Sequence, residues 1–382
     1  MSAEDTGPGI RLSGALGEDA RGAASSGALA IGILRGEGIG PEVVGVAEDV
    51  LGCVAGQSAR RFDLAEGGAI GGAAREECGA DLSSEVEGFC EDIFSRQGAV
   101  LCGPGGGRFV YDLRARFDLF CKLTPVTPLP ALADAGVMKA SARRDVDLVV
   151  VRENAGGLYF GEGAQRGAGP ERSADHRFAY REDEVARILE VAMRLAAARR
   201  GKIMLALKPG GVPAISALWQ NCFQRVSAEH RVEAAVLEID NAVYQVLEKA
   251  REFDVVVAPN MFADVLSDAC SLLLGSRGMS FSGNFSARGH AVFQTGHGAA
   301  HDLAGKDEAN PIGQVLSVAM MLRESFGLDR EAAAIEAAVV RTVGAGWRTR
   351  DIAGRDSTVV GTREMGRRIC SELERLLAAG RE

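Results

Sequence analysis

Residues 28–41, ALAIGILRGEGIGP, place a run of small and branched apolar residues directly before a glycine-rich loop and a proline. The apolar run Ala28–Leu34 predicts a buried strand, and Pro41 at the first helical position predicts a helix that runs to about Val54. The loop Arg35–Gly40 between them reads GxGxG rather than GxGxxG. It therefore meets the dinucleotide-binding fingerprint of a Rossmann fold only in part.

The same succession of strand, loop and helix continues along the chain. Gly98–Cys102 is another apolar run that ends in a glycine loop, Gly103–Gly107. Further strands are predicted at 147–151, 203–207, 253–258 and 291–293, and helices near 183–200, 264–274, 311–326 and 330–344. Strands that alternate with helices indicate an α/β protein.

Composition narrows the classes of protein that this chain can be. It has 382 residues with a formal net charge of −9 and no long run of Lys or Arg, so nucleic acid and anionic membrane are excluded as expected partners. No apolar stretch approaches the ~20 residues of a membrane span. The eight cysteines are scattered without a CxxC pair, which favours a reducing, cytoplasmic location. Residues 1–27 lack a signal-peptide core and are predicted to be a flexible extension.

An acidic pair in the segment Asn260–Asp268 indicates a metal site. On a helix, Asp264 and Asp268 lie one turn apart on the same face. Two such carboxylates repel each other unless a cation lies between them, and oxygen ligands suit Mg²⁺ or Mn²⁺. A solvated acidic helix face is the alternative interpretation.

Three other segments carry candidate catalytic or binding residues, and each has an ordinary structural alternative. In Val151–Gly161, Arg152 is a candidate carboxylate clamp and Tyr159 a candidate general acid, or else a tyrosine on the edge of the core. Lys208 follows a strand and precedes a glycine turn, where a lysine of lowered pKa can act as a base. In Gly296–Pro311, glycines permit close approach of a flat ligand and an acidic side chain can accept from ribose hydroxyls, or the segment is a surface loop.

In this order and spacing, these segments resemble the isocitrate/isopropylmalate dehydrogenase family, the metal-dependent β-decarboxylating dehydrogenases. The resemblance runs from about residue 28 to the C-terminus and includes 36–42, 113–120, 348–351 and 361–364. It implies an isopropylmalate-dehydrogenase-like fold of two α/β domains around a central cleft. Residues 28–119 with 276–382 would form the cofactor-side domain, and 120–275 the domain for dimerisation, metal binding and catalysis. Homodimers in this family share their active sites.

The resemblance also implies a role for each matching residue. The expected metal ligands are Asp264 and Asp268, with Asp240 donated by the other subunit, and the metal is Mg²⁺ or Mn²⁺. Lys208 resembles the partner-donated base and Tyr159 the acid. The expected cofactor site consists of His297, Gly298, Asp302 and Asn310, and the acidic Asp302 favours NAD over NADP. The expected carboxylate-binding residues include Arg114 and Arg152.

The reaction that the resemblance implies uses these residue types directly. Hydride passes from C2 of a 2-hydroxy acid to NAD⁺ while Lys208 removes the hydroxyl proton. The divalent cation then polarises the new ketone and stabilises the charge that develops when the β-carboxylate leaves as CO₂. Tyr159 returns a proton to C3.

Departures from the family pattern bear on the substrate. Thr124 stands where the family has a third arginine, and Lys122, two residues back, lies on the same face of an extended segment and can restore the charge. Arg108 lies in an unusual glycine-rich loop and could meet an additional anionic group. We therefore predict a divergent member that decarboxylates an unusual 3-substituted malate, such as a phosphonate, in a specialised pathway.

Several alternatives remain open from the sequence. One is a dehydrogenase of primary metabolism that acts on isopropylmalate, homoisocitrate or tartrate. Another is a dehydrogenase that does not decarboxylate. A third is a catalytically silent regulatory paralogue, although the five candidate metal and proton-transfer residues are all present.

Overall fold

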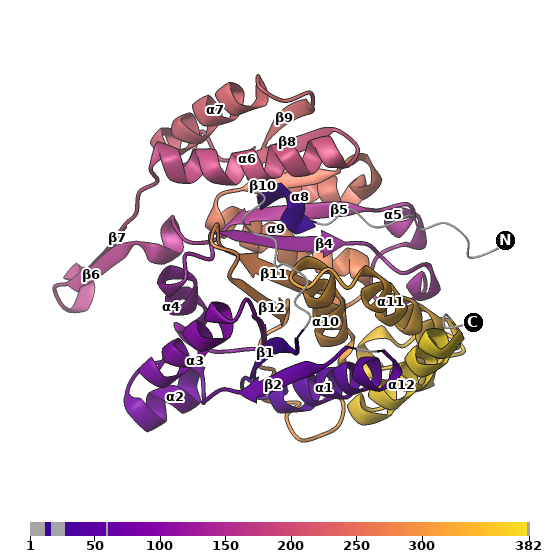
Figure 1. Ribbon diagram of the computed structural model, residues 1–382. Helices are drawn as coiled ribbons and strands as arrows, with labels where there is room; N and C mark the ends of the chain where they lie inside the picture. Colours follow the sequence, from indigo (N-terminus) through magenta and orange to yellow (C-terminus); the bar gives the residue numbers. More distant parts are fainter. Residues whose placement is uncertain (1–11, 17–26, 59, 380–382) are drawn as a thin grey trace.

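A computed structural model describes residues 12–16, 27–58 and 60–379, in which a ten-stranded sheet forms the centre of an α/β protein (Figure 1). The strand order across the sheet is β2-β1-β3-β12-β11-β4-β5-β10-β8-β9. The strands are β1 Leu29–Leu34, β2 Phe62–Glu66, β3 Ala99–Cys102, β4 Cys121–Val126, β5 Leu148–Glu153, β8 Lys202–Leu207, β9 Glu233–Glu238, β10 Val255–Ala258, β11 Phe281–Phe285 and β12 Ala291–Thr295. The predicted α/β class is confirmed.

The sheet consists of two parallel halves joined by an antiparallel centre. β2, β1, β3 and β12 run parallel to one another, as do β5, β10, β8 and β9. Between the halves, β4 pairs antiparallel with both β5 and β11. One half is built from the two ends of the chain and the other from its middle.

Helices cover both faces of each half, as buried parallel strands require. Near the chain ends, α1, α10, α11 and α12 pack together, and α3 contacts β1 and β3. In the other half, α6 contacts β5, β8 and β10, whereas α8 and α9 contact β9 and β5 respectively. The helices are α1 Gly40–Gln57, α2 Gly71–Cys78, α3 Ser84–Ser95, α4 Phe109–Arg116, α5 Ala140–Arg143, α6 Glu182–Ala198, α7 Pro213–Ser227, α8 Ile239–Glu248, α9 Asn260–Leu274, α10 Ile312–Glu324, α11 Asp329–Gly344 and α12 Thr362–Ala379.

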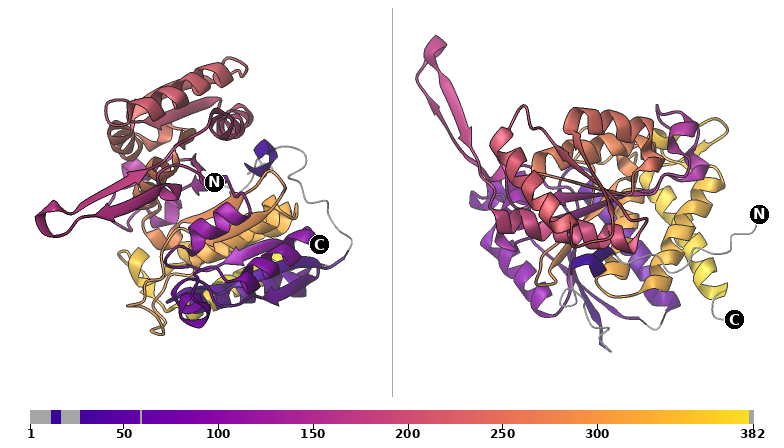
Figure 2. Two further views of the ribbon diagram at one scale, coloured as in Figure 1. Left: turned by 90° about the vertical axis from the view of Figure 1, so that its left-hand side faces the viewer. Right: turned by 90° about the horizontal axis from the view of Figure 1, so that it is seen from above.

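Two small strand pairs complete the fold. A hairpin of β6, Glu162–Arg166, and β7, Ser173–Arg177, projects away from the rest of the chain, and every residue of both strands is exposed (Figure 2). β13, Trp347–Arg348, pairs with β14, Thr358–Val359. Within the part of the chain that the structure describes, no helix is long and apolar enough to cross a membrane.

The predicted elements correspond to observed ones with shifted ends. The predicted helix 264–274 is α9, which begins four residues earlier at Asn260, directly after Pro259. Because proline disfavours helix at the residue before it, Pro259 limits how far α9 can extend toward the N-terminus.

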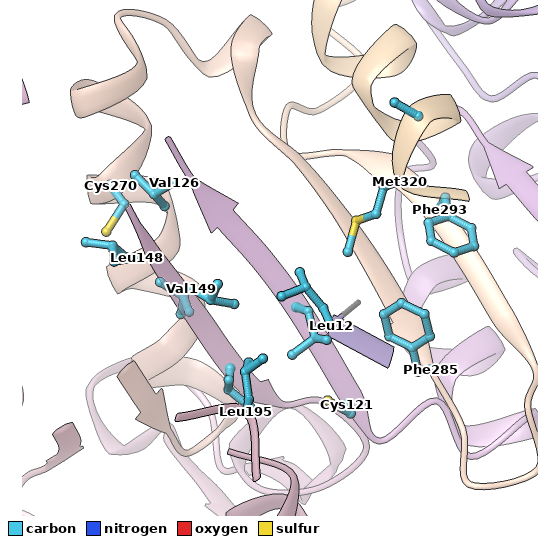
Figure 3. Packing of buried hydrophobic residues seen from close by; sticks show 14 of the residues in the cluster. Leu12, Cys121, Val126, Leu148, Val149, Leu195, Cys270, Phe285, Phe293 and Met320 are labelled. Carbon is cyan, nitrogen blue, oxygen red and sulfur yellow. The ribbon is translucent and has the colours of Figure 1, made fainter. Parts of the chain in front are cut away.

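Part of the predicted flexible extension is packed against the core. Residues Leu12–Leu16 form a short 3₁₀ helix that contacts α6. Leu12 is buried in a cluster with side chains from helices that cover both halves of the sheet, including Leu195 on α6 and Met320 on α10 (Figure 3). The backbone N–H groups of Leu12 and Ser13 donate to the buried carboxylate of Glu324 at 3.2 and 2.7 Å. These contacts attach residues 12–16 to the core, and the other residues of 1–26 lie outside the described range.

Removing the Glu324 carboxylate should weaken the attachment of this segment. In Glu324→Ala, two buried backbone donors lose their acceptor, and we expect the free energy of unfolding to fall by about 1–3 kcal/mol. Chemical denaturation would measure the loss, with Glu324→Gln as the control that keeps one acceptor oxygen. An unchanged stability in Glu324→Ala would show that the two carboxylate hydrogen bonds do not stabilise the fold.

Candidate active site

The candidate acid and metal ligand meet where β5 ends and α9 begins. Arg152 lies on β5, and its guanidinium forms an ion pair with the Asp264 carboxylate. The Tyr159 hydroxyl, carried by the turn after β5, donates to the other Asp264 oxygen at 2.9 Å. Burial acts to raise the pKa of Asp264, but the Arg152 and Lys122 charges outweigh it and hold the pKa below its usual value. Asp264 is therefore ionised and available as an oxygen ligand.

Three buried cations surround this carboxylate, and we call Arg114, Lys122 and Arg152 the cation cluster. Lys122 on β4 lies directly opposite Arg152 in the antiparallel register, so both side chains are on the same face of the sheet. Arg114 comes from the last turn of α4. The three residues are 5%, 8% and 3% exposed, respectively.

Nearby carboxylates balance the charges of this cluster only in part: Asp264 acts on all three cations and Asp268 also acts on Lys122. Within residues 27–58 and 60–379, neither the Arg114 guanidinium nor the Lys122 ammonium group has a hydrogen-bond or ion-pair partner, and only Arg152 is paired. Burial and the neighbouring arginines lower the pKa of Lys122 to about 7, and burial with Arg152 lowers that of Arg114 to about 9. Buried cations without partners are costly, so the arrangement is suited to an anionic ligand.

The other two candidate substrate residues lie at different depths. Thr124 is buried on β4, two residues beyond Lys122 and on the same face. Arg108 is exposed at the start of α4 and donates weakly to Asp112 at 3.4 Å. Among the described residues, the Tyr111 ring links Arg108 to the site, with its centroid 5.3 Å from the Arg108 guanidinium.

Sequence reasoning missed two residues of this site, Tyr111 and Asn260. The Tyr111 ring packs edge-on against Tyr159, with centroids 5.4 Å apart, and the Arg114 guanidinium lies 5.7 Å above it. The sequence spacing could have identified Tyr111, since it precedes the candidate Arg114 by three residues and so lies on the same face of the helix. Asn260 opens the acidic motif, and its contacts with Arg152 depend on a pairing 108 residues apart that no local pattern reveals.

Two candidate oxygen donors for a metal lie on α9. Asp264 and Asp268 lie one turn apart on α9, as predicted, and Asp268 also pairs with Arg277 at 2.8 Å. Across residues 12–16, 27–58 and 60–379, no three His, Cys, Asp or Glu side chains converge as a metal centre would require. One chain thus offers carboxylates of the type that Mg²⁺ or Mn²⁺ prefers, but fewer than a complete site.

The structure does not bring Lys208 and Asp240 to this cluster. Lys208 follows β8 and donates to Glu238 at 2.6 Å and to Asp240 at 2.9 Å, at the β9 edge of the sheet. In the described part of the chain, neither Lys208 nor Asp240 bonds to Arg152, Tyr159 or Asp264. The two acidic partners raise the pKa of Lys208, so within one chain it is a protonated ion-pair partner rather than a base.

The candidate cofactor residues follow β12 and lead into α10. His297 Nδ1 lies 2.9 Å from the Gly298 carbonyl, its Nε2 is buried with no partner among the described residues, and burial lowers its pKa. Asn310 donates to Asp351 at 3.0 Å, and its side-chain oxygen accepts from the backbone N–H of Ile312 at the start of α10. Asp302 and Gly298 are exposed.

The GxGxG loop contacts the segment that carries the candidate cofactor residues. The backbone N–H of Ile39 donates to the carbonyl of Ala299 at 2.8 Å. Gly38 has φ +58°, and a Cβ there would lie 2.0 Å from the same carbonyl oxygen. Glycine is therefore required at this position so that two loops can touch, which is a different use from a Rossmann phosphate loop.

Similarity to known proteins extends over nearly the whole chain. A sequence model of the family described as isocitrate/isopropylmalate dehydrogenase matches residues 30–369. The 3-isopropylmalate dehydrogenase of Bacillus subtilis is 39% identical, covering 90% of this chain and 97% of that enzyme. The 3-isopropylmalate dehydrogenase of Synechococcus elongatus is 38% identical, covering 91% and 98%.

Solved structures agree with these sequence comparisons. Isocitrate dehydrogenase from Methylococcus capsulatus superimposes with a TM-score of 0.80 at 29% identity, covering 91% of this chain and 99% of that one. The TT0538 protein from Thermus thermophilus superimposes with a TM-score of 0.81 at 28% identity, covering 94% of this chain and 71% of that one. The resemblance inferred from the motifs is confirmed, and the chain belongs to the isocitrate/isopropylmalate dehydrogenase family of oxidoreductases.

Proposed function

We propose that this protein catalyses NAD-dependent, divalent-metal-dependent oxidative decarboxylation of a 3-substituted malate. The observation that carries the proposal is the cation cluster, in which two buried cations without a partner in the described chain adjoin the Asp264 carboxylate and the Tyr159 hydroxyl. A substrate with two carboxylates neutralises these charges and places its reacting carbons beside the candidate acid.

The relatives favour 3-isopropylmalate as the substrate. Matches at 38–39% identity over about nine-tenths of the chain are 3-isopropylmalate dehydrogenases. Nothing in the comparisons supports the predicted unusual substrate, and the alternative of an isopropylmalate dehydrogenase of primary metabolism agrees with them better. Thr124 does not decide the matter, because Lys122 supplies a buried cation on the same strand face.

The metal and NAD would each use residues described above. Asp264 and Asp268 would hold Mg²⁺ or Mn²⁺, which when bound polarises the C2 oxygen and stabilises charge that develops there. His297, Gly298, Asp302 and Asn310 would contact NAD. Tyr159 keeps its proton, because burial and the adjacent Asp264 raise its pKa above the usual value.

A homodimer with shared active sites would complete the metal and base positions. Lys208 and Asp240 lie at the β9 edge, which is exposed, and edge strands and apolar helix faces invite a partner. Exposed apolar side chains include Tyr244 on α8 and Val265 on α9.

The eight cysteines are free, consistent with the reducing cytoplasm that we propose for this enzyme.

Turnover of a malate panel tests the proposed function. The purified protein would be mixed with NAD⁺ and Mn²⁺, and absorbance of the reduced cofactor followed with 3-isopropylmalate, malate, tartrate, isocitrate, homoisocitrate and phosphonomethylmalate. We expect cofactor reduction with equimolar CO₂ on 3-isopropylmalate, and loss of both upon chelation of the metal. Reduction without CO₂ would indicate a plain dehydrogenase, and no turnover of any compound would favour a silent paralogue.

Replacing Lys122 should weaken substrate binding. In Lys122→Met, the site loses a buried cation, and we expect KM to rise roughly 10- to 100-fold with a smaller change in kcat. Because burial and the neighbouring arginines lower the pKa of Lys122 to about 7, its charge is lost as pH rises through this value, so wild-type KM should increase above neutral pH. Lys122→Arg should remove that pH dependence, and Thr124→Arg added to Lys122→Met should recover affinity. An unchanged KM in Lys122→Met would exclude a substrate role.

A further inference from the structure

The side chain of Asn260 joins two segments that carry active-site residues. Asn260 is fully buried at the first position of α9. Its Oδ1 accepts from Arg152 Nε at 2.9 Å, and its Nδ2 donates to the carbonyl of Gly156 at 2.8 Å. Asparagine caps a helix from the N-cap position, but here Pro259 occupies that position and no described side chain caps the start of α9. The amide is therefore used for these two contacts instead.

The Gly156 carbonyl belongs to the turn that leads to Tyr159. This turn is tightly confined, since Gly157 has φ +72° and a Cβ there would lie 2.1 Å from the Tyr180 hydroxyl. The same Tyr180 oxygen accepts from the backbone N–H of Asn260 at 3.0 Å. Asn260 thus holds the turn directly with its amide and also through Tyr180.

These contacts close a ring of interactions that includes Arg152, one member of the cation cluster. Arg152 bonds to Asn260 at one nitrogen and to Asp264 at another. Tyr159 bonds to the same Asp264 carboxylate at 2.9 Å, and the turn that carries Tyr159 returns to Asn260. Arg152 is held through two guanidinium nitrogens, and Tyr159 through its hydroxyl and the turn that carries its backbone. Both side chains therefore have little freedom to rotate, and such fixed orientation of reacting groups contributes to catalysis.

We propose that Asn260 is a positioning residue that sets Arg152 and Tyr159 relative to each other, an inference that rests on the proposed function. The role requires one group that accepts from the guanidinium and donates to the carbonyl, and an amide does both. A carboxylate would keep the acceptor and lose the donor. An alanine would lose both and leave a buried guanidinium nitrogen and a partly buried carbonyl without these partners.

The two variants should therefore have different kinetic effects. In Asn260→Asp, Arg152 keeps its acceptor while the turn is released, so we expect KM within about threefold of the wild type and kcat lowered about 10-fold or more. In Asn260→Ala, we expect KM to rise and kcat to fall, with kcat/KM reduced about 100-fold or more. The assay is steady-state turnover of the malate that is active in the panel, with NAD⁺ and Mn²⁺.

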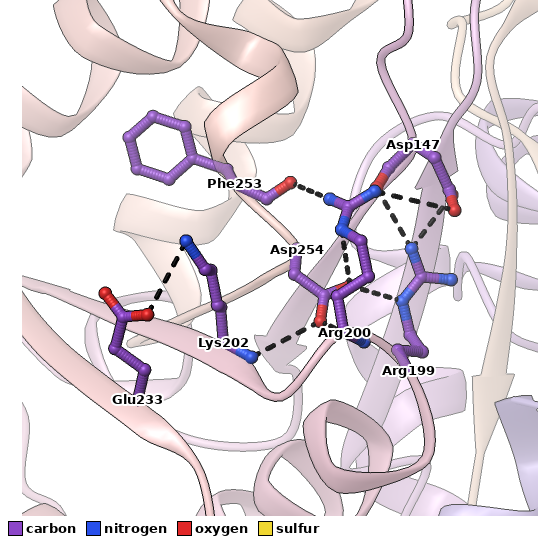
Figure 4. A network of polar contacts seen from close by, with 7 residues as sticks. All are labelled: Asp147, Arg199, Arg200, Lys202, Glu233, Phe253 and Asp254. Atoms are coloured by element: carbon purple, nitrogen blue, oxygen red, sulfur yellow. Dashed lines mark hydrogen bonds and ion pairs between the residues drawn. The ribbon is translucent and has the colours of Figure 1, made fainter.

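A buried polar residue at the far end of the neighbouring strand provides a matched control. Asp254, directly before β10, accepts from Arg199 at 2.7 Å and from the backbone N–H of Arg200 at 2.8 Å, and it does not contact the cluster (Figure 4). Asp254→Asn should lower Tm while leaving kcat and KM unchanged. If Asn260→Ala also lowers only Tm, Asn260 is merely structural and the proposal is wrong.

Calorimetry separates failure of this proposal from failure of the proposed function. Arg152 is expected to bind a carboxylate whether or not turnover follows, so binding of 3-isopropylmalate to the wild type and to Asn260→Ala can be compared without catalysis. A wild type that binds this malate without turnover overturns the proposed function, and weaker binding by Asn260→Ala would still support positioning of Arg152. Equal binding by the two proteins of the malate that is active in the panel would overturn the positioning proposal, and no binding of any malate in the panel by the wild type would overturn both proposals.

Discussion

Replacing Tyr159 with phenylalanine should lower kcat by roughly 10²- to 10⁴-fold, the usual cost of removing a proton-transfer group. The ring contact with Tyr111 and the ion pair between Arg152 and Asp264 do not involve the Tyr159 hydroxyl, so they are retained. Substrate and metal binding should therefore change little, and KM should stay within a few-fold of the wild type. Steady-state assays with 3-isopropylmalate and Mn²⁺ would measure both constants.

The neighbouring tyrosine provides the control for this experiment. Tyr111→Phe also removes a phenol hydroxyl from the same aromatic pair, but Arg108 and Arg114 contact the face of the Tyr111 ring, which phenylalanine keeps. We expect its kcat to remain within a few-fold of the wild type. If Tyr159→Phe is as active as Tyr111→Phe, the proton donor is another group. A large rise in KM in Tyr159→Phe would instead assign its hydroxyl to binding.

The elements that the sequence predicted well are those whose burial is uniform. β1, β3 and β10 are buried at every position, so each is a continuous apolar run that ends in a loop. β9, Glu233–Glu238, was not predicted, because five of its six residues are exposed at the edge of the sheet. Its position depends on pairing with β8, which a local pattern does not contain.

The candidate site was predicted residue by residue, but its grouping was not. Arg152, Tyr159 and Asp264 meet within one chain because β5 and β10 are parallel. The turn after β5 and the helix α9 after β10 therefore lie at the same, carboxyl ends of these strands. Lys122 joins them through the antiparallel β4–β5 register, which the sequence suggested only as an extended segment. By contrast, Lys208 and Asp240 lie apart from these residues and bind each other. The separation of Lys208 and Asp240 from Arg152, Tyr159 and Asp264 follows from the order of the strands in the sheet, which local sequence patterns do not contain.

Mixing two inactive variants provides a direct test of whether the two groups meet across a dimer. Tyr159→Phe and Lys208→Met are each expected to lose at least about 99% of activity. If Lys208 of one subunit serves Tyr159 of the other, a mixed dimer has one site with both defects and one intact site. Random exchange makes half of the dimers mixed, so activity should return to about a quarter of the wild-type value.

The same mixture distinguishes the shared site from a site within one chain. If Lys208 and Tyr159 of the same subunit act together, every site in a mixed dimer carries one defect and activity stays at the level of the single variants. The control mixture is Tyr159→Phe with Asp264→Asn, since Tyr159 and Asp264 bond within one chain. Each site in that mixed dimer has either a defective Tyr159 or a defective Asp264, whichever subunit supplies Lys208, so its activity should not return. Recovery in the first mixture alone therefore assigns Lys208 to the partner's site, because subunit exchange by itself would affect both mixtures equally.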